Sequence, residues 1–206
     1  MRVGVLISGR GSNMAALIAA AAEPGHPYEI AVVIANKADA GGLAVAQAAG
    51  IPTVIVSGRE FTDRAAFDVA LDVELRRHDV EIIALAGFMR ILGAGFISGW
   101  PDRIVNIHPS LLPAFRGLDT HRRTLDAGCK VAGCTVHIVR AELDDGPILA
   151  QAVVPVLDDD DEASLAARIL VEEHRIYPEA IRALADRRVT IDGMRTRIGQ
   201  RRRLSR

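Results

Sequence analysis

The stretch Arg2-Val3-Gly4-Val5-Leu6-Ile7-Ser8-Gly9-Arg10-Gly11-Ser12-Asn13 joins a short apolar run to a glycine-rich turn. Similar β-branched runs, bounded by Gly, Pro, Asn or Asp, follow at residues 29–35, 53–56, 80–86 and 103–107. Stretches with helical content lie between them, at residues 13–22, 41–49, 63–78 and 93–99. Strands that alternate with helices predict an α/β fold with a Rossmann-like, doubly wound, mostly parallel sheet. Ligands of such sheets bind beyond the carboxyl ends of the strands.

The pattern changes after residue 130. Two strand-like runs, 131–139 and 148–154, are joined by an acidic loop and predict an antiparallel C-terminal extension of the sheet. A helical stretch follows over 161–187, where Pro178 is expected to kink or restart the helix. We therefore expect a single domain over residues 1–190 and an Arg-rich, solvated tail over residues 191–206.

Composition restricts the class of protein. The chain has 206 residues, a formal net charge of −1, and 50% hydrophobic residues. It therefore lacks the global basic charge that holds nucleic acids, and no apolar run reaches the length of a membrane span. Two cysteines are too few for a disulfide framework, and no signal-peptide core is recognisable. These features predict a cytoplasmic protein with no nucleic-acid or membrane partner.

The turn after the first strand is a candidate anion site. Gly9 and Gly11 allow a tight turn that leaves backbone amides free at the start of a helix. The dinucleotide fingerprint would require a third glycine where the chain has Met14, so a small phosphate or carboxylate is favoured over NAD. The alternative is an ordinary strand-to-helix turn in which Ser12 or Asn13 caps the helix.

A second candidate site follows the fifth strand. Alternation along a strand places Asn106 and His108 on the same side. An amide donor beside an imidazole suits acyl transfer, because both can stabilise a developing oxyanion. Asp144 is a candidate partner for His108, although Glu142 and Asp145 compete on spacing alone. The alternative is a structural core histidine with a loop-capping Asn106 and a solvated acidic loop.

Neither a strong nucleophile nor a metal site is evident. Ser110 lacks a glycine elbow, so direct transfer is simpler than a covalent enzyme intermediate. Cys134 and His137 are three residues apart on a predicted strand and are expected to face opposite sides, so burial is favoured over metal binding. The acidic run at residues 158–162 lacks EF-hand spacing and is interpreted as the start of a helix.

Four segments resemble the folate-dependent phosphoribosylglycinamide formyltransferases. They are Ile7-Ser8-Gly9-Arg10-Gly11-Ser12-Asn13, Ala86-Gly87-Phe88-Met89-Arg90-Ile91-Leu92, Asn106-Ile107-His108-Pro109-Ser110-Leu111-Leu112-Pro113 and Glu142-Leu143-Asp144-Asp145-Gly146-Pro147. The resemblance extends from residue 2 to about residue 190. It implies that 10-formyltetrahydrofolate, as co-substrate, gives its formyl group to the amine of glycinamide ribonucleotide in de novo purine synthesis. No metal is expected to be required.

The resemblance also implies roles for individual residues. The implied catalytic residues are Asn106, His108 and Asp144. The implied ribonucleotide-binding residues are Gly11, Ser12, Asn13 and Glu173, where the alternative for Glu173 is a salt bridge with a neighbouring arginine. The implied folate-binding residues are Arg64, Met89, Arg90, Ile91, Leu92, Asn106, Arg140, Ala141, Glu142, Leu143 and Asp144.

The chain departs from the family pattern in one loop. Arg116 and Asp119 stand where some members of the family are expected to have Pro and His. The dipeptide Arg116-Gly117 is also similar to the corresponding loop of tRNA-dependent relatives. A stand-alone formyltetrahydrofolate hydrolase and a non-enzymatic phosphosugar-binding module remain alternatives. Both a hydrolase and a tRNA-dependent enzyme would be expected to carry an additional domain. Apolar faces are compatible with a homodimer, but nothing in the sequence selects one.

Overall fold

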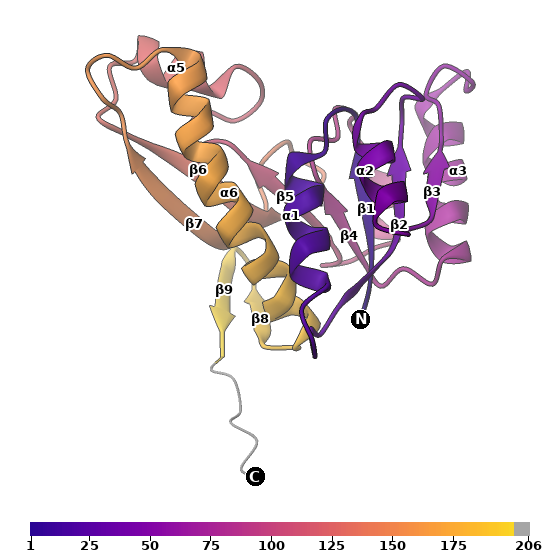
Figure 1. Ribbon diagram of the computed structural model, residues 1–206. Coiled ribbons are helices and arrows are strands. Elements are labelled where there is room, and N and C mark those ends of the chain that lie inside the picture. Colours follow the sequence, from indigo (N-terminus) through magenta and orange to yellow (C-terminus); the bar gives the residue numbers. More distant parts are fainter. Residues whose placement is uncertain (200–206) are drawn as a thin grey trace.

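The computed structural model describes residues 1–199, and its centre is a seven-stranded sheet with the order β3-β2-β1-β4-β5-β6-β7 (Figure 1). Neighbours among the first five strands are parallel, whereas β6 and β7 pair antiparallel with the strand before them. The predicted doubly wound sheet with its antiparallel extension is therefore confirmed. The strands are β1 (Arg2–Ile7), β2 (Glu29–Ala35), β3 (Thr53–Ile55), β4 (Ile82–Leu85), β5 (Ile104–His108), β6 (Val131–Ile138) and β7 (Ile148–Pro155).

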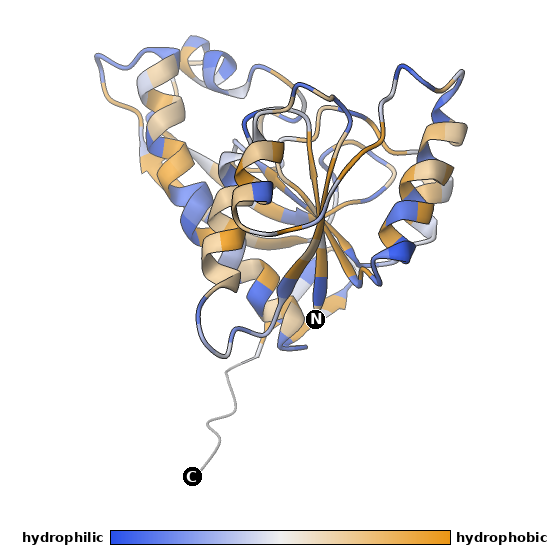
Figure 2. Ribbon diagram, turned by 45° about the vertical axis from the view of Figure 1, so that its right-hand side comes forward, coloured by the Kyte–Doolittle hydropathy of each residue, from blue (hydrophilic) through white to orange (hydrophobic). Residues whose placement is uncertain are grey.

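Helices cover both faces of the sheet. One apolar core joins the sheet to α1 (Ser12–Ala21), α2 (Gly42–Ala48) and α6 (Glu162–Ala185). The other joins it to α3 (Arg64–Arg77) and α4 (Ala94–Ser98). Alternation explains the division, because Val5 and Ile7 of β1 belong to the first core and Leu6 to the second. Figure 2 shows the hydrophobic strands enclosed between the helices of the two faces.

The long helix α6 differs from the expectation in one respect. It continues through Pro178 as a single helix from Glu162 to Ala185, so the helix does not restart there. Proline removes one backbone hydrogen bond from the helix. Tertiary packing offsets this loss, because the side chain of the adjacent Tyr177 is fully buried and its hydroxyl lies 3.0 Å from the carbonyl oxygens of Leu85 and Val105. The acidic run before α6 does serve the helix start, since the Asp161 side chain accepts a hydrogen bond from Ser164 N.

The C-terminal part contains elements that the sequence patterns did not predict. α5 (Thr120–Asp126) follows the loop after β5, and β8 (Val189–Asp192) pairs with β9 (Arg195–Ile198) as a separate hairpin. The expected boundary at residue 190 falls inside β8, and Thr196 donates a hydrogen bond to the Ile148 carbonyl of β7. The rest of the Arg-rich tail, residues 200–206, lies outside the described residues. Within residues 1–199, no helix has the length and apolar character needed to cross a membrane.

Candidate active site

The turn between β1 and α1 leaves backbone amides uncapped. Gly11 is the N-cap residue of α1, has a φ of +71°, and no side chain caps the helix. The alternative in which Ser12 or Asn13 caps the helix is therefore wrong. The first-turn amides of α1 point out of the carboxyl edge of the sheet without a side-chain acceptor. Such an array of amides, with the positive end of the helix dipole, attracts an anion.

Beside this turn, Asn13 and Glu173 form a buried pair from segments far apart in the sequence. Asn13 Nδ2 donates to Glu173 Oε2 at 2.7 Å, and Glu173 is only 6% exposed. Burial raises the pKa of Glu173, while the hydrogen bond from Asn13 opposes that rise. The ion pair with an arginine that was the alternative for Glu173 is formed by Glu172 instead, which binds Arg175. Asn13 Oδ1 is buried and has no hydrogen-bond partner within the described residues.

The acidic loop between β6 and β7 brings Asp144 to His108. His108 Nδ1 lies 3.5 Å from Asp144 Oδ2, and both side chains are nearly fully buried. Gly117 N also donates to Asp144 Oδ2, at 2.9 Å. Asp145 is engaged elsewhere, since its carboxylate pairs with Arg116. Of the three acids that competed on spacing, Asp144 is therefore the one that contacts His108.

Both ring nitrogens of His108 face hydrogen-bond acceptors. Its Nε2 lies 3.0 Å from the Phe115 carbonyl oxygen, which can only accept a hydrogen bond, so Nε2 carries a proton. Its Nδ1 faces the Asp144 carboxylate, which is also an acceptor. The His108 ring is therefore held between two acceptors at the end of β5.

His137 is a site residue that the sequence interpretation missed. Asn106 pairs with His137 across the antiparallel β5 and β6, and Asn106 Nδ2 lies 3.3 Å from His137 Nε2. Because His137 Nδ1 donates to the Ile138 carbonyl, Nε2 is free to accept from Asn106. Burial lowers the pKa of His137, which keeps the ring neutral for this role. Sequence patterns could not reveal this contact, because it depends on the register in which β5 pairs with β6.

The potential metal ligands of β6 do not form a metal site. Cys134 is fully buried in the core, and burial raises the pKa of its thiol to about 12. Among the residues that the structure describes, no group of His, Cys, Asp and Glu side chains is arranged to hold a metal ion.

The segment after β4 presents an apolar surface at the same edge of the sheet. Met89 and Ile91 are 69% and 64% exposed, whereas Leu92 is buried. Met89 N donates to Ser8 Oγ at 2.7 Å, which ties this segment to the turn after β1. The Arg90 guanidinium stacks on Phe67 of α3, the helix that begins at Arg64. Exposed apolar side chains held in place in this way are typical of a ligand-binding surface.

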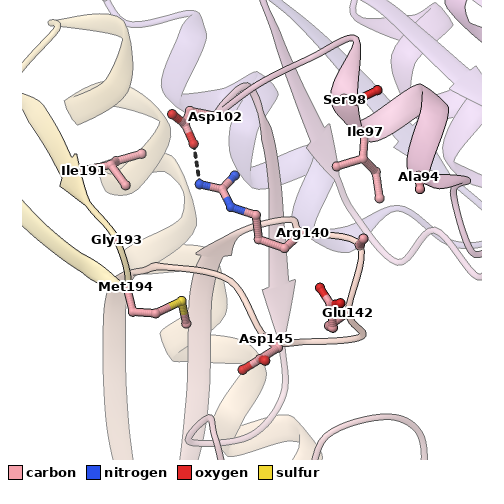
Figure 3. A pocket seen from close by; sticks show the side chains of 11 residues that line it. Ala94, Ile97, Ser98, Asp102, Arg140, Glu142, Asp145, Ile191, Gly193 and Met194 are labelled. Atoms are coloured by element: carbon pink, nitrogen blue, oxygen red, sulfur yellow. Dashed lines mark hydrogen bonds and ion pairs between the residues drawn. The ribbon is translucent and has the colours of Figure 1, made fainter.

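A cavity of about 740 Å³ lies between the loop after β6 and the β8–β9 hairpin (Figure 3). Arg140, Ala141 and Glu142 line it, whereas residues 89–92 do not. Figure 3 shows Arg140 paired with Asp102, which precedes β5, while His108 ends that strand. His108, at the other end of β5, is not among the residues that line this cavity.

Three neighbouring strands bring the anion turn, the apolar segment and His108 to the carboxyl edge of the sheet. The anion turn follows β1, the apolar segment follows β4, and His108 ends β5, and these strands are adjacent in the sheet. An amide donor, an imidazole and a carboxylate can together stabilise an oxyanion and transfer a proton. The geometry therefore suits transfer of an acyl-type group to an acceptor that carries an anionic group.

Comparisons with known proteins agree with this chemistry. The family described as formyl transferase matches residues 1–181. The phosphoribosylglycinamide formyltransferase of Escherichia coli strain K12 is 44% identical over 189 residues, which cover 92% of this chain and 89% of that protein. The crystal structure of glycinamide ribonucleotide transformylase 1 from Symbiobacterium toebii has a TM-score of 0.94 and 49% identity, and covers 96% of this chain and 93% of that one.

A longer relative contains the same segment. The trifunctional purine biosynthetic protein adenosine-3 of Bos taurus is 47% identical over 184 residues, 89% of this chain. The chain spans only 18% of the length of that protein. The similarity is thus confined to one part of the trifunctional protein and covers nearly all of the bacterial one. On its sequence, its fold and its edge of polar side chains, this chain belongs to the formyl transferase family.

Proposed function

We propose that this formyltransferase moves the formyl group of 10-formyltetrahydrofolate to the amine of glycinamide ribonucleotide, a step of purine synthesis. The arrangement of Asn106, His108 and Asp144 is the observation that carries the proposal, because it combines an amide donor with an imidazole held by a carboxylate. The names of relatives that match most of the chain support the choice of substrates.

The turn after β1 is proposed to bind the ribonucleotide. Its phosphate meets the amides of Gly11, Ser12 and Asn13, which no side chain caps. Glu173 accepts hydrogen bonds from the ribose hydroxyls, and Asn13 holds its carboxylate in place. The buried, unpartnered Oδ1 of Asn13 supports the same proposal, because an acceptor of this kind needs a donor from the ligand.

The folate is proposed to lie against the apolar segment after β4. Its ring system packs on Met89, Arg90, Ile91 and Leu92, and Arg64 meets the carboxylates of its glutamate tail. The loop after β6 completes this binding surface through Arg140, Ala141, Glu142, Leu143 and Asp144. All these residues belong to one chain, so the proposal requires no second copy, nucleic acid or membrane.

The reaction is a direct transfer. The ribonucleotide amine attacks the formyl carbon, a new C–N bond forms, and the carbonyl oxygen becomes an oxyanion. The second N–H of Asn106 Nδ2 and the positive charge of His108 stabilise this oxyanion. The intermediate then breaks the bond to N10 of the folate, and the proton that the amine loses passes through water to N10. Asp144 stabilises the imidazolium throughout.

The folate chromophore supplies the test. The purified protein is mixed with 10-formyltetrahydrofolate, with and without glycinamide ribonucleotide, and deformylation is followed by absorbance for the wild type and for His108→Ala. We expect turnover that requires the ribonucleotide and falls at least about 100-fold in the variant. His78→Ala, which lies at the far end of α3, is the matched control and should retain full activity. Turnover without the ribonucleotide would instead identify a hydrolase.

A further inference from the structure

The loop after β5 has a conformation that local sequence preference does not favour. Phe115, Gly117 and Asp119 all have positive φ values, of +52°, +80° and +56°. Such values cost about 1 kcal/mol or more for residues other than glycine, so contacts from outside must hold this loop.

The backbone of this loop contacts both members of the His108–Asp144 pair. The Phe115 carbonyl accepts from His108 Nε2 at 3.0 Å, and Gly117 N donates to Asp144 Oδ2 at 2.9 Å. Both contacts depend on backbone atoms, whose positions follow the shape of the loop. A small change in the loop would therefore move the imidazole and the carboxylate relative to each other.

One side chain joins several residues of the loop. Arg123 of α5 donates through Nη1 to the carbonyl oxygens of Arg116 and Leu118, at 2.6 and 3.2 Å. Its guanidinium also lies over the Phe115 ring, 5.5 Å from the ring centroid. Arg116 ties the same loop to the other side of the site through its ion pair with Asp145. Arg123 thus contacts three of the four residues from 115 to 118, although it is itself exposed.

We propose that Arg123 is a positioning residue for formyl transfer, which acts through the loop at residues 115–118 to orient His108 and Asp144. The proposal rests on the function proposed above. An exposed arginine contributes little to global stability, whereas a displacement of catalytic groups by a fraction of an ångström lowers the rate strongly. Arg123 should therefore affect kcat and the environment of His108 more than it affects unfolding.

The test compares Arg123→Met with Arg122→Met in the full chain. Both variants have an unbranched side chain without charge, but Arg122 hydrogen-bonds Glu162 rather than the backbone of residues 115–118. Long-range ¹⁵N–¹H spectra report the His108 ring, whose signals are assigned from their loss in His108→Gln. Kinetics with both substrates give kcat and KM separately, and thermal unfolding controls for stability.

We expect Arg123→Met to shift the His108 signals and to lower kcat about tenfold, with KM for the ribonucleotide changed less than about twofold. Arg122→Met should change neither, and Arg123→Lys, which keeps the charge and one donor, should recover most of kcat. Unchanged His108 signals in Arg123→Met would overturn the proposal, as would an equal loss of kcat in Arg122→Met. Because the spectra need no turnover, failure of this proposal can be told apart from failure of the proposed function.

Discussion

Glu173→Gln should make the protein more stable and a poorer enzyme. The carboxylate is 6% exposed, receives one hydrogen bond from Asn13 at 2.7 Å, and forms no ion pair within residues 1–199. Burial is the largest influence on Glu173 and raises its pKa, so it outweighs the hydrogen bond. Glutamine keeps an oxygen that accepts from Asn13 but removes the buried charge. A buried carboxylate at this position lowers the stability of the fold, so its charge is better explained by ligand binding than by folding.

The size of the effect follows from this balance. The cost of burying an incompletely paired polar group is about 1–3 kcal/mol, and the Asn13 bond offsets part of it, which leaves about 1 kcal/mol. In a chain of 206 residues this gain corresponds to a rise in Tm of about 2–4 °C. The loss of a charged acceptor for the ribose hydroxyls should lower kcat/KM for the ribonucleotide about 10- to 100-fold.

The gain in stability should depend on pH in a defined direction. The pKa of Glu173 is higher in the folded than in the unfolded chain, so the folded protein binds the proton more tightly. Wild-type stability therefore falls as the pH rises from the unfolded pKa through the folded one. Below both values the carboxyl group is neutral and resembles glutamine. The difference in Tm between the variant and the wild type should accordingly be larger at pH 8 than at pH 5.

Calorimetry at the two pH values and steady-state kinetics measure both effects. Glu172→Gln is the control, because it removes the neighbouring carboxylate, which pairs with Arg175 at the surface. That variant should show neither the gain in Tm nor the loss of kcat/KM. The reasoning would be refuted if Glu173→Gln were less stable than the wild type at pH 8, or if its gain were the same at both pH values.

Further substitutions test other parts of the site and the fold. Asn106→Ala removes an oxyanion donor and should lower kcat about 100- to 1000-fold in the absorbance assay with little change in Tm; a loss below tenfold would exclude that role. Gly11→Ala places a Cβ 3.1 Å from Met14 Cε at a φ of +71°. Urea unfolding should therefore detect a loss of stability of about 1–2 kcal/mol, and kinetics should give a higher KM for the ribonucleotide. Gly9→Ala is the control, because a Cβ at Gly9 meets no atom within 4 Å. Tyr177→Phe removes the hydroxyl between two strand carbonyls and should cost about 1–3 kcal/mol in urea unfolding, with kcat unchanged.

The sequence by itself determined the order of the elements and the place of the anion turn. The apolar runs, their bounding residues and the glycines of the first turn are local features, and a parallel sheet follows from their alternation with helices. Asn106 and His108 could be placed on one side of a strand for the same reason, because side chains alternate with a period of two.

Only the tertiary structure decided which distant groups meet. It selected Asp144 over Glu142 and Asp145, paired Asn106 with His137, and carried α6 through Pro178. Strand register, loop packing and burial against the sheet set these outcomes, and they join residues separated by tens of positions. A local pattern carries no such information, because the free energy that fixes these contacts arises only when the elements pack together.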